Sequence, residues 1–329
     1  MTQHQNSEIR KKLFIGGTGR SGTTIIAHML GLHPEIYTFP KEIRFITDPD
    51  GVISLKSAIV DNWSFFQADF AIERFFTFMS KLKKKSLGSY PTIDFASMVG
   101  GDFYDQWLDS LRKELIDFEF NSNWIGRTSG FKKVLSKKVL TTNEKRKPFF
   151  PKSYFCSRKS EEEFNAIMSN WLNAFFVQAA EFNGKKYALD HTPMNNLHAD
   201  VFAKIMPESK ILHVYRDPRD VISSFTTQEW GDTPEHNLMW VNDIYKTWDD
   251  IKQKLPSDYY YEIAFETFID NPEVEIKKIL DFYGIDFHPD IMKIKLNKPH
   301  IGRYTQNLSP EVIKKIEETI NPRYFPENR

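Results

Sequence analysis

Short apolar runs alternate with longer amphipathic segments at the start of the chain and again in its second half. The apolar runs cover residues 13–15, 186–190, 210–215 and 259–265. The amphipathic segments cover residues 194–206, 234–254, 272–283 and 310–320. Thr233-Pro234 and Ser309-Pro310 are typical helix starts, and Gly284 is a typical helix end. Strands that alternate with helices predict an α/β fold, with a central parallel sheet flanked by helices.

The pattern changes between residues 50 and 185, where aromatic-rich helical stretches dominate. One of them, EEEFNAIMSNWLNAFFVQAAEF, follows Ser160, and Glu163 completes a capping-box signature. We therefore expect a large, mostly helical insertion within a single domain of residues 1–329. Aromatic side chains at helical spacing more often form a core than a binding pocket.

Composition narrows the class of protein. The chain has 329 residues, of which 40% are hydrophobic and 15% aromatic, enough for a packed core. Its formal net charge is +0, so no overall field favours nucleic acid as a partner. Cys156 is the single cysteine and excludes an internal disulfide. We found no signal peptide and no apolar run near the ~20 residues of a membrane span, so we expect a cytoplasmic protein. The oligomeric state leaves no sequence signal.

Positive charge is concentrated between residues 127 and 159. This stretch holds eleven lysine and arginine residues and one acidic residue, Glu144. It is typical of a solvated loop and would equally suit a lid over an anionic ligand or an attraction for an anionic acceptor.

A glycine-rich turn, GTGRSGTT at 17–24, follows the first apolar run. Such a turn between a strand and a helix presents backbone N–H groups to an anion, and the helix dipole assists. The spacing fits the nucleotide loop G-x-x-x-x-G-K-[ST], except that Thr23 occupies the lysine position. The cation within the loop is Arg20. The turn therefore indicates an anion site, but one that lacks a main electrostatic element of γ-phosphoryl transfer.

A second constellation lies in RDPRDVISS at 216–224. Arg216 ends an apolar run, and Ser224 follows about two turns into the next predicted helix. Asp217 and Pro218 suit the start of that helix. An arginine fork and a hydroxyl would bind a second phosphate. Taken alone, the segment equally fits an exposed helix start with solvated Arg216–Asp220 and Asp217–Arg219 pairs.

Together the two stretches resemble the signature motifs of the sulfotransferases that use 3′-phosphoadenosine-5′-phosphosulfate (PAPS). HPEIYTFPKEIRF at 33–45 resembles their bacterial and tyrosylprotein branch, and HIGRYTQNLSPEVIKKI at 300–316 resembles their terminal loop and helix. The resemblance covers roughly 12–46, 186–228 and 259–320, and it implies a P-loop-type nucleotide-binding fold. It leaves out the helical insertion, which we assign to the acceptor side.

The resemblance implies roles for individual residues. The 5′-phosphosulfate would be held by Arg20, Ser21, Gly22, Thr23 and Thr24. The 3′-phosphate would be bound by Arg216 and Ser224, with Arg303 as a further contact. Arg20 would also stand near the transferring group. The product would be adenosine 3′,5′-bisphosphate, and no metal is implied.

Two positions compete for the general base. Glu42 falls where the tyrosylprotein branch has its base. His191, in ALDHTP at 188–193, stands where many bacterial relatives have a lysine, and it also has the spacing to a proline that the cytosolic branch has for its catalytic histidine. We favour Glu42 as the base with His191 assisting. Phe265 replaces the tyrosine that usually provides a hydroxyl on the adenine side.

Alternative functions are a P-loop nucleotide kinase or phosphotransferase, and a nucleotide-binding module without catalysis. The acceptor itself is not specified. The aromatic insertion suits an alcohol or phenol, and the basic stretch suits a glycan or a peptide.

Overall fold

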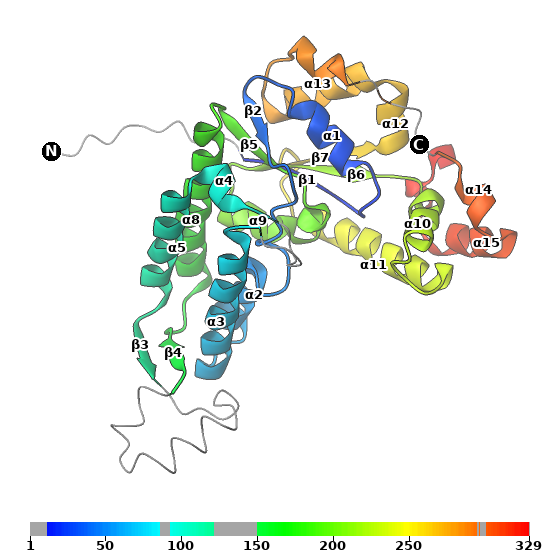
Figure 1. Ribbon diagram of the computed structural model, residues 1–329. Helices are drawn as coiled ribbons and strands as arrows, with labels where there is room; N and C mark the ends of the chain where they lie inside the picture. The colour runs from blue at the N-terminus through cyan, green and yellow to red at the C-terminus, as the bar shows by residue number, and fades with distance from the viewer. Residues whose placement is uncertain (1–11, 86–92, 122–149, 295, 297–300, 329) are drawn as a thin grey trace. The chain divides into compact units, whose positions relative to one another are not determined.

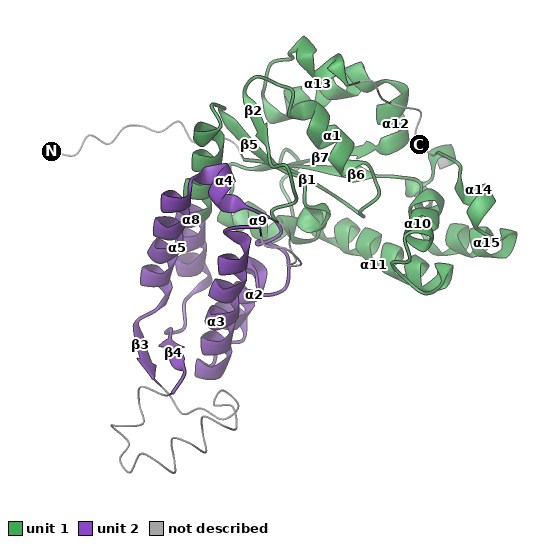
Figure 2. Cartoon of the chain, viewed as in Figure 1, with its two compact units in different colours: residues 1–43, 172–329 green, residues 44–171 purple. Residues whose placement is uncertain are grey.

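The computed structural model describes residues 12–85, 93–121, 150–294, 296 and 301–328 (Figure 1). The chain forms two compact units (Figure 2). The first comprises residues 1–43 and 172–329, and the second comprises residues 44–171. The second unit begins and ends earlier in the chain than the expected insertion of residues 50–185. The boundary at 171/172 falls inside helix α8 (Glu161–Phe182).

A five-stranded sheet forms the centre of the first unit, with the strand order β2-β5-β1-β6-β7. All four strand pairings are parallel, which confirms the predicted fold class. The strands are β1 (Lys12–Gly17), β2 (Ile36–Thr38), β5 (Tyr187–Asp190), β6 (Lys210–Tyr215) and β7 (Tyr260–Ala264). The sequence pattern predicted four of them. It missed β2, which is only three residues long.

Helices cover both faces of this sheet, as Figure 1 shows. Leu13 and Ile15 of β1 belong to a buried cluster that also contains residues of helices α1 and α13. Phe14 points to the other face, because side chains alternate along a strand. Its ring lies 5.3 Å from that of Phe176 in α8 and 4.9 Å from that of Phe202 in α9. The helical segments of this unit, apart from α8, are α1 (Thr23–Leu30), η3 (Pro193–His198), α9 (Ala199–Ile205), α10 (Pro218–Thr227), α11 (Pro234–Lys252), α12 (Phe265–Asp270), α13 (Pro272–Tyr283), η4 (Pro289–Lys293), α14 (Tyr304–Asn307), α15 (Pro310–Thr319), η5 (Pro322–Tyr324) and η6 (Pro326–Asn328).

Local residues set the ends of these helices. Asp217 caps α10 by accepting a hydrogen bond from the backbone N–H of Arg219 at 2.9 Å. Gly284 ends α13 in the left-handed region, at φ 69°. The helix expected over 194–206 is divided instead into a 3₁₀ segment, η3, and α9. Asn195 belongs to that 3₁₀ segment, and its side-chain Nδ2 donates to the carbonyl oxygen of Ile15 at 3.3 Å.

The second unit contains helices and a small hairpin. Its elements are α2 (Val52–Lys56), the π-helical turn η1 (Ser57–Asp61), α3 (Phe65–Leu82), α4 (Phe95–Val99), α5 (Gly101–Leu115), the antiparallel strands β3 (Phe118–Asn121) and β4 (Lys152–Phe155), and the first half of α8. The indole rings of Trp107 and Trp171 stack at 3.9 Å, and both are buried. Ser160 and Glu163 make both hydrogen bonds of the predicted capping box, at 2.8 and 3.1 Å. The buried, stacked rings of Trp107 and Trp171 show that aromatic side chains form the core of this unit.

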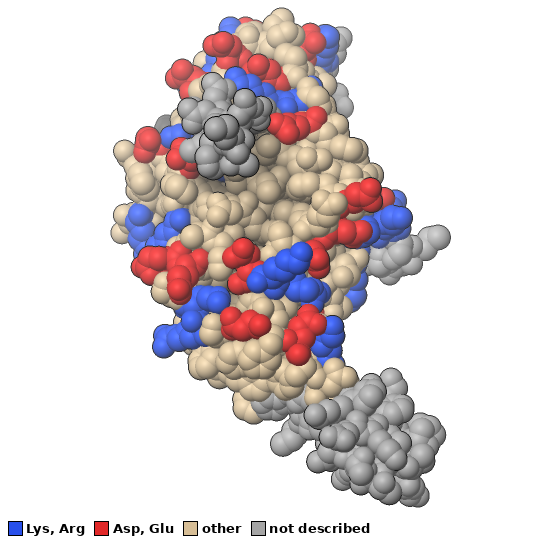
Figure 3. Space-filling model, turned by 90° about the vertical axis from the view of Figure 1, so that its left-hand side faces the viewer, with Lys and Arg blue, Asp and Glu red and all other residues tan. Residues whose placement is uncertain are grey.

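Charges of both signs are interspersed on the face shown in Figure 3. Most of the basic stretch 127–159 lies outside the described residues. Of the part that is described, Lys152 pairs with Glu119 at 2.5 Å. Among the helices of the described ranges, none is both long and apolar enough to cross a membrane.

Candidate functional site

The loop between β1 and α1 is shaped by close contacts at two glycines. A Cβ atom on Gly17 would lie 2.4 Å from Oγ of Ser21 and 2.5 Å from the carbonyl oxygen of Val214. A Cβ atom on Gly22, whose φ is 98°, would lie 2.2 Å from the ring of Phe265. Only glycine fits at either position, so the loop can keep its close-packed course.

The same loop carries features that suit an anion. Ser21 is fully buried, and within the described part of the chain its Oγ has no hydrogen-bond partner. Helix α1 begins at Thr23 without a side-chain cap, so its first N–H groups face the loop. Thr23 is buried and Thr24 is exposed. An orphaned hydroxyl beside an uncapped helix N-terminus is the arrangement that a bound phosphate or sulfate group satisfies.

The two sequence motifs meet at this loop. Arg20 has a left-handed backbone, at φ 55°, and its Nε donates to Oγ of Ser224 in α10 at 3.1 Å. Arg216, at the end of β6, donates from Nη1 to the carbonyl oxygen of Arg20 at 3.2 Å. Three of the predicted binding residues, separated by about two hundred positions in the chain, are thus in direct contact.

The charged residues around Arg216 are buried, so the solvated helix start considered from the sequence is wrong. Arg216 is 9% exposed and lies 3.4 Å from the carboxylate of Asp220. Arg219 lies 2.7 Å from Asp217, and both are also buried. Burial raises the pKa of Asp217, while the hydrogen bonds from Arg219 act in the opposite direction.

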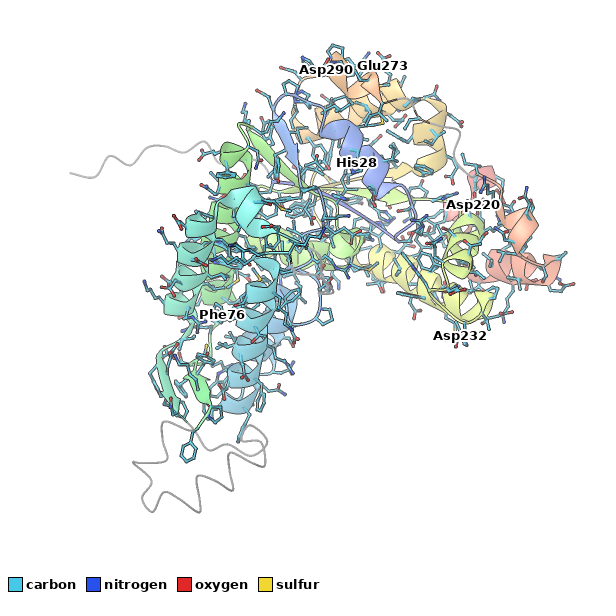
Figure 4. All side chains as sticks on the ribbon, viewed as in Figure 1. His28, Phe76, Asp220, Asp232, Glu273 and Asp290 are labelled. Carbon is cyan, nitrogen blue, oxygen red and sulfur yellow. The ribbon has the colours of Figure 1, made fainter. Side chains whose placement is uncertain are left out.

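The C-terminal segment is attached to helix α10. Arg219 also pairs with Glu317 at 2.7 Å and with Glu327 at 3.0 Å. Asp220, labelled in Figure 4, accepts the backbone N–H groups of Gly302 at 2.8 Å and Tyr304 at 3.2 Å. These contacts hold the backbone on both sides of Arg303, whose side chain is exposed.

Asp190, at the end of β5, organises the segments that carry the two candidate bases. Its carboxylate is fully buried. Oδ1 accepts from the backbone N–H of Ile43 at 3.2 Å, and Oδ2 accepts from Nδ2 of Asn195 at 2.7 Å. Thr192 adds a backbone bond at 3.2 Å and a hydroxyl bond at 2.9 Å. Because Ile43 follows Glu42 and Asp190 precedes His191, one carboxylate fixes the backbone beside both candidate bases.

His191 is 3% exposed, and among the described residues its Nδ1 has no hydrogen-bond partner. Burial lowers its pKa below the ordinary value of 6.5. The charge of Asp190 raises this pKa, whereas His28 and Lys41 lower it further. The rings of His191 and His28, the latter labelled in Figure 4, are 6.4 Å apart. His191 is therefore neutral at pH 7 and can accept a proton. Glu42 is partly exposed.

Removing the anchoring carboxylate should cost stability. We expect Asp190→Ala to lower the free energy of unfolding by about 2–4 kcal/mol, because it leaves several buried donors without an acceptor. Asp258→Ala is the matched control, since that side chain is 82% exposed and should change stability by about 0.5 kcal/mol or less. Urea unfolding measures both, and equal losses would contradict the anchoring role.

A parallel sheet with a glycine-rich loop between β1 and helix α1 defines a P-loop-type α/β protein. A sequence model of the sulfotransferase family matches residues 120–289, just over half of the chain. The chain therefore belongs to the sulfotransferase family, a class of enzymes. The matched region contains His191, Arg216 and Ser224, whereas the glycine-rich loop lies before it.

The individual relatives of this chain share little sequence identity with it. The omega-hydroxy-beta-dihydromenaquinone-9 sulfotransferase Stf3 of Mycobacterium bovis is 22% identical over 123 residues. That match covers 33% of this chain and 32% of the relative, so the chain spans about a third of its length. The sulfotransferase domain of the Synechococcus PCC 7002 olefin synthase superimposes with a TM-score of 0.46 and 15% identity, over 99% of this chain and 95% of that one. Sulfotransferase STF9 of Mycobacterium avium superimposes with a TM-score of 0.44 and 10% identity, over 95% of this chain and 76% of that one.

Sequence reasoning missed two carboxylates that shape the site. Asp190 ends the run YALD, and an acidic residue at the end of an apolar strand was a usable signal. Asp220 was recognised only as a partner of Arg216. Its bonds to the C-terminal segment join residues more than eighty positions apart, and no spacing rule indicates them.

Proposed function

We propose that this protein transfers a sulfuryl group from PAPS to an acceptor hydroxyl or amine, releasing adenosine 3′,5′-bisphosphate. The observation that carries this proposal is the hydrogen bond between Arg20 and Ser224. This bond connects the β1–α1 loop, which suits one anion, with Arg216 and Ser224, which suit a second anion. A nucleotide with phosphate groups on both the 5′ and 3′ positions matches such a pair of sites.

The donor would be bound by the residues predicted from the sequence. The 5′-phosphosulfate would be held by Arg20, Ser21, Gly22, Thr23 and Thr24, and the 3′-phosphate by Arg216 and Ser224, with Arg303 nearby. Ser21 supports this assignment because it places a buried hydroxyl without a partner, among the described residues, inside the loop.

The chemistry would be an in-line displacement at sulfur. The acceptor oxygen or nitrogen forms a bond to sulfur, the bond from sulfur to the bridging phosphate oxygen breaks, and a base takes the acceptor proton. Arg20 would stabilise the charge that develops on the bridging oxygen. Thr23 in the lysine position makes phosphoryl transfer from ATP the weaker alternative.

Glu42 would act as the base, with neutral His191 assisting. Asp190 would position both, because it binds the backbone next to each of them. The acceptor class is inferred from the relative Stf3. Stf3 is named for an omega-hydroxy compound, and a hydroxyl on a partly apolar molecule is the acceptor that we infer for this chain. A cytoplasmic location stays a prediction.

Titration calorimetry with adenosine 3′,5′-bisphosphate, adenosine 5′-phosphate and ATP with Mg²⁺ tests the donor. We expect the bisphosphate to bind most tightly. Arg216→Ala should weaken its binding about 10²-fold, as expected for loss of a charge-assisted contact, and should leave adenosine 5′-phosphate nearly unchanged.

Lys314→Ala is the control for Arg216→Ala, because it also removes one positive charge and the Lys314 side chain is 75% exposed. Tighter binding of ATP than of the bisphosphate would overturn the proposal. Transfer of labelled sulfate from PAPS to a panel of alcohols and phenols then separates an enzyme from a module that only binds nucleotides.

A further inference from the structure

Large apolar side chains are exposed directly after helix α10. Trp230 is 48% exposed, Met239 is 68% exposed and Trp240 is 46% exposed. All three lie within eleven positions, at the turn between α10 and α11 and on the first turns of α11. Figure 4 labels Asp232 in this turn. Exposed tryptophans that gather at one place indicate a binding surface more than scattered apolar residues do.

The indole of Trp230 lies against the glycine-rich loop. A Cβ atom built on Gly19 would lie 3.5 Å from Cζ3 of Trp230 and 4.0 Å from Cζ of Phe225. Phe225 is buried, and its ring centroid is 4.7 Å from that of Trp230 and 5.6 Å from that of Trp240. Both exposed indoles thus pack on the buried ring of Phe225.

The turn that carries Trp230 is held in place. The backbone N–H of Trp230 donates to the carbonyl oxygen of Phe225 at 3.1 Å. Asn237 is buried, and its Nδ2 donates to Oγ1 of Thr226 at 3.1 Å, which joins α11 to α10. A surface that is formed in advance binds with a smaller entropic cost than one that must be ordered.

The position of this surface along the loop indicates what it binds. Gly19 adjoins Arg20, the cation assigned to the transferring group. The other end of the loop, at Gly22, is packed against Phe265, whose ring lies 5.4 Å from Arg216. The Gly22 end of the loop therefore has its own aromatic residue. Trp230 covers the Gly19 end, beside the cation assigned to the transferring group.

We propose that Trp230 and Trp240, packed on Phe225, bind the apolar part of the acceptor and select alkyl or aryl alcohols. This inference rests on the proposed function and adds the residues that would bind the apolar part of its acceptor. It moves part of acceptor recognition from the helical insertion to the α10–α11 turn. The indoles would cover the alkyl or aryl group while the hydroxyl points toward Arg20.

The test measures binding rather than turnover, using the full chain saturated with adenosine 3′,5′-bisphosphate. Titration with 4-alkylphenols from methyl to hexyl should show affinity rising about two- to four-fold per added methylene. Trp230→Ala should weaken 4-hexylphenol binding about ten-fold and flatten the dependence on chain length. Trp230→Phe should retain part of the affinity. Phe182→Ala, which removes an aromatic side chain 53% exposed at the end of α8, should change nothing.

Each outcome separates this inference from the proposed function. If wild-type protein does not bind the bisphosphate, the proposed function fails. If it binds the bisphosphate but no alkylphenol, or if Trp230→Ala keeps the full dependence on chain length, this inference is overturned. Loss of bisphosphate affinity in Trp230→Ala would assign the indole to the nucleotide and would also overturn it.

Discussion

Replacing Glu42 by glutamine is expected to lower kcat by about 10²- to 10⁴-fold, the usual range for loss of a general base. Glutamine keeps the size and polarity of the side chain but cannot take the acceptor proton. The affinity for adenosine 3′,5′-bisphosphate should stay within about two-fold, because the proposed donor contacts lie on the β1–α1 loop and α10. Initial rates with labelled PAPS, at saturating acceptor, measure the effect.

His191 provides the comparison. His191→Asn should lower kcat by about ten-fold, an assisting role rather than that of the base. Because burial holds the pKa of His191 below 6.5, its neutral form predominates at pH 7. The contribution of His191 to kcat should therefore be constant from pH 7 upward and decline only in acid, as the imidazole becomes protonated.

Chemical rescue decides between the two bases. Formate should restore part of the activity of Glu42→Ala, whereas imidazole should not restore His191→Ala. The reverse pattern would assign the base to His191. Unchanged turnover in both variants would remove both residues from the mechanism.

Replacing Arg20 by alanine is expected to lower kcat by about 10²- to 10³-fold, as observed when one preorganised donor to a developing charge is removed. The bisphosphate lacks the sulfuryl group, so its affinity should decrease much less than kcat. Arg20→Lys should keep most of the activity because it retains the cation, although it loses the Nε bond to Ser224.

The left-handed backbone at Arg20 requires its own control. Alanine keeps the same steric cost at φ 55°, whereas glycine removes it. Arg20→Ala and Arg20→Gly should therefore lose similar activity, and Arg20→Gly should be the more stable in thermal unfolding. A kcat near the wild-type value in either variant would contradict the role of Arg20.

Local signals were enough for most of the fold of the first unit. The predicted strands at 13–15, 186–190, 210–215 and 259–265 all form, and they pair as the expected parallel sheet. The helix starts at Pro234 and Pro310 and the helix end at Gly284 were predicted correctly, because a cap is a contact between residues close together in the chain. The segment 194–206 was predicted as one helix, and it is divided in the structure. The fold of the second unit was harder to predict from the sequence. Its hairpin pairs residues 118–121 with 152–155, and this pairing joins segments that are far apart in the chain.

The sequence by itself determined the β1–α1 loop, the missing lysine and the residues that we propose bind two anions, because each depends on residue type and short spacing. Only the tertiary structure decided which of them meet. It placed Arg20 against Ser224, tied Ile43 to Asp190, and set Trp230 beside Gly19. These contacts join positions 147 to 211 residues apart. They arise when sheet and helices pack, and no local pattern in the chain specifies them.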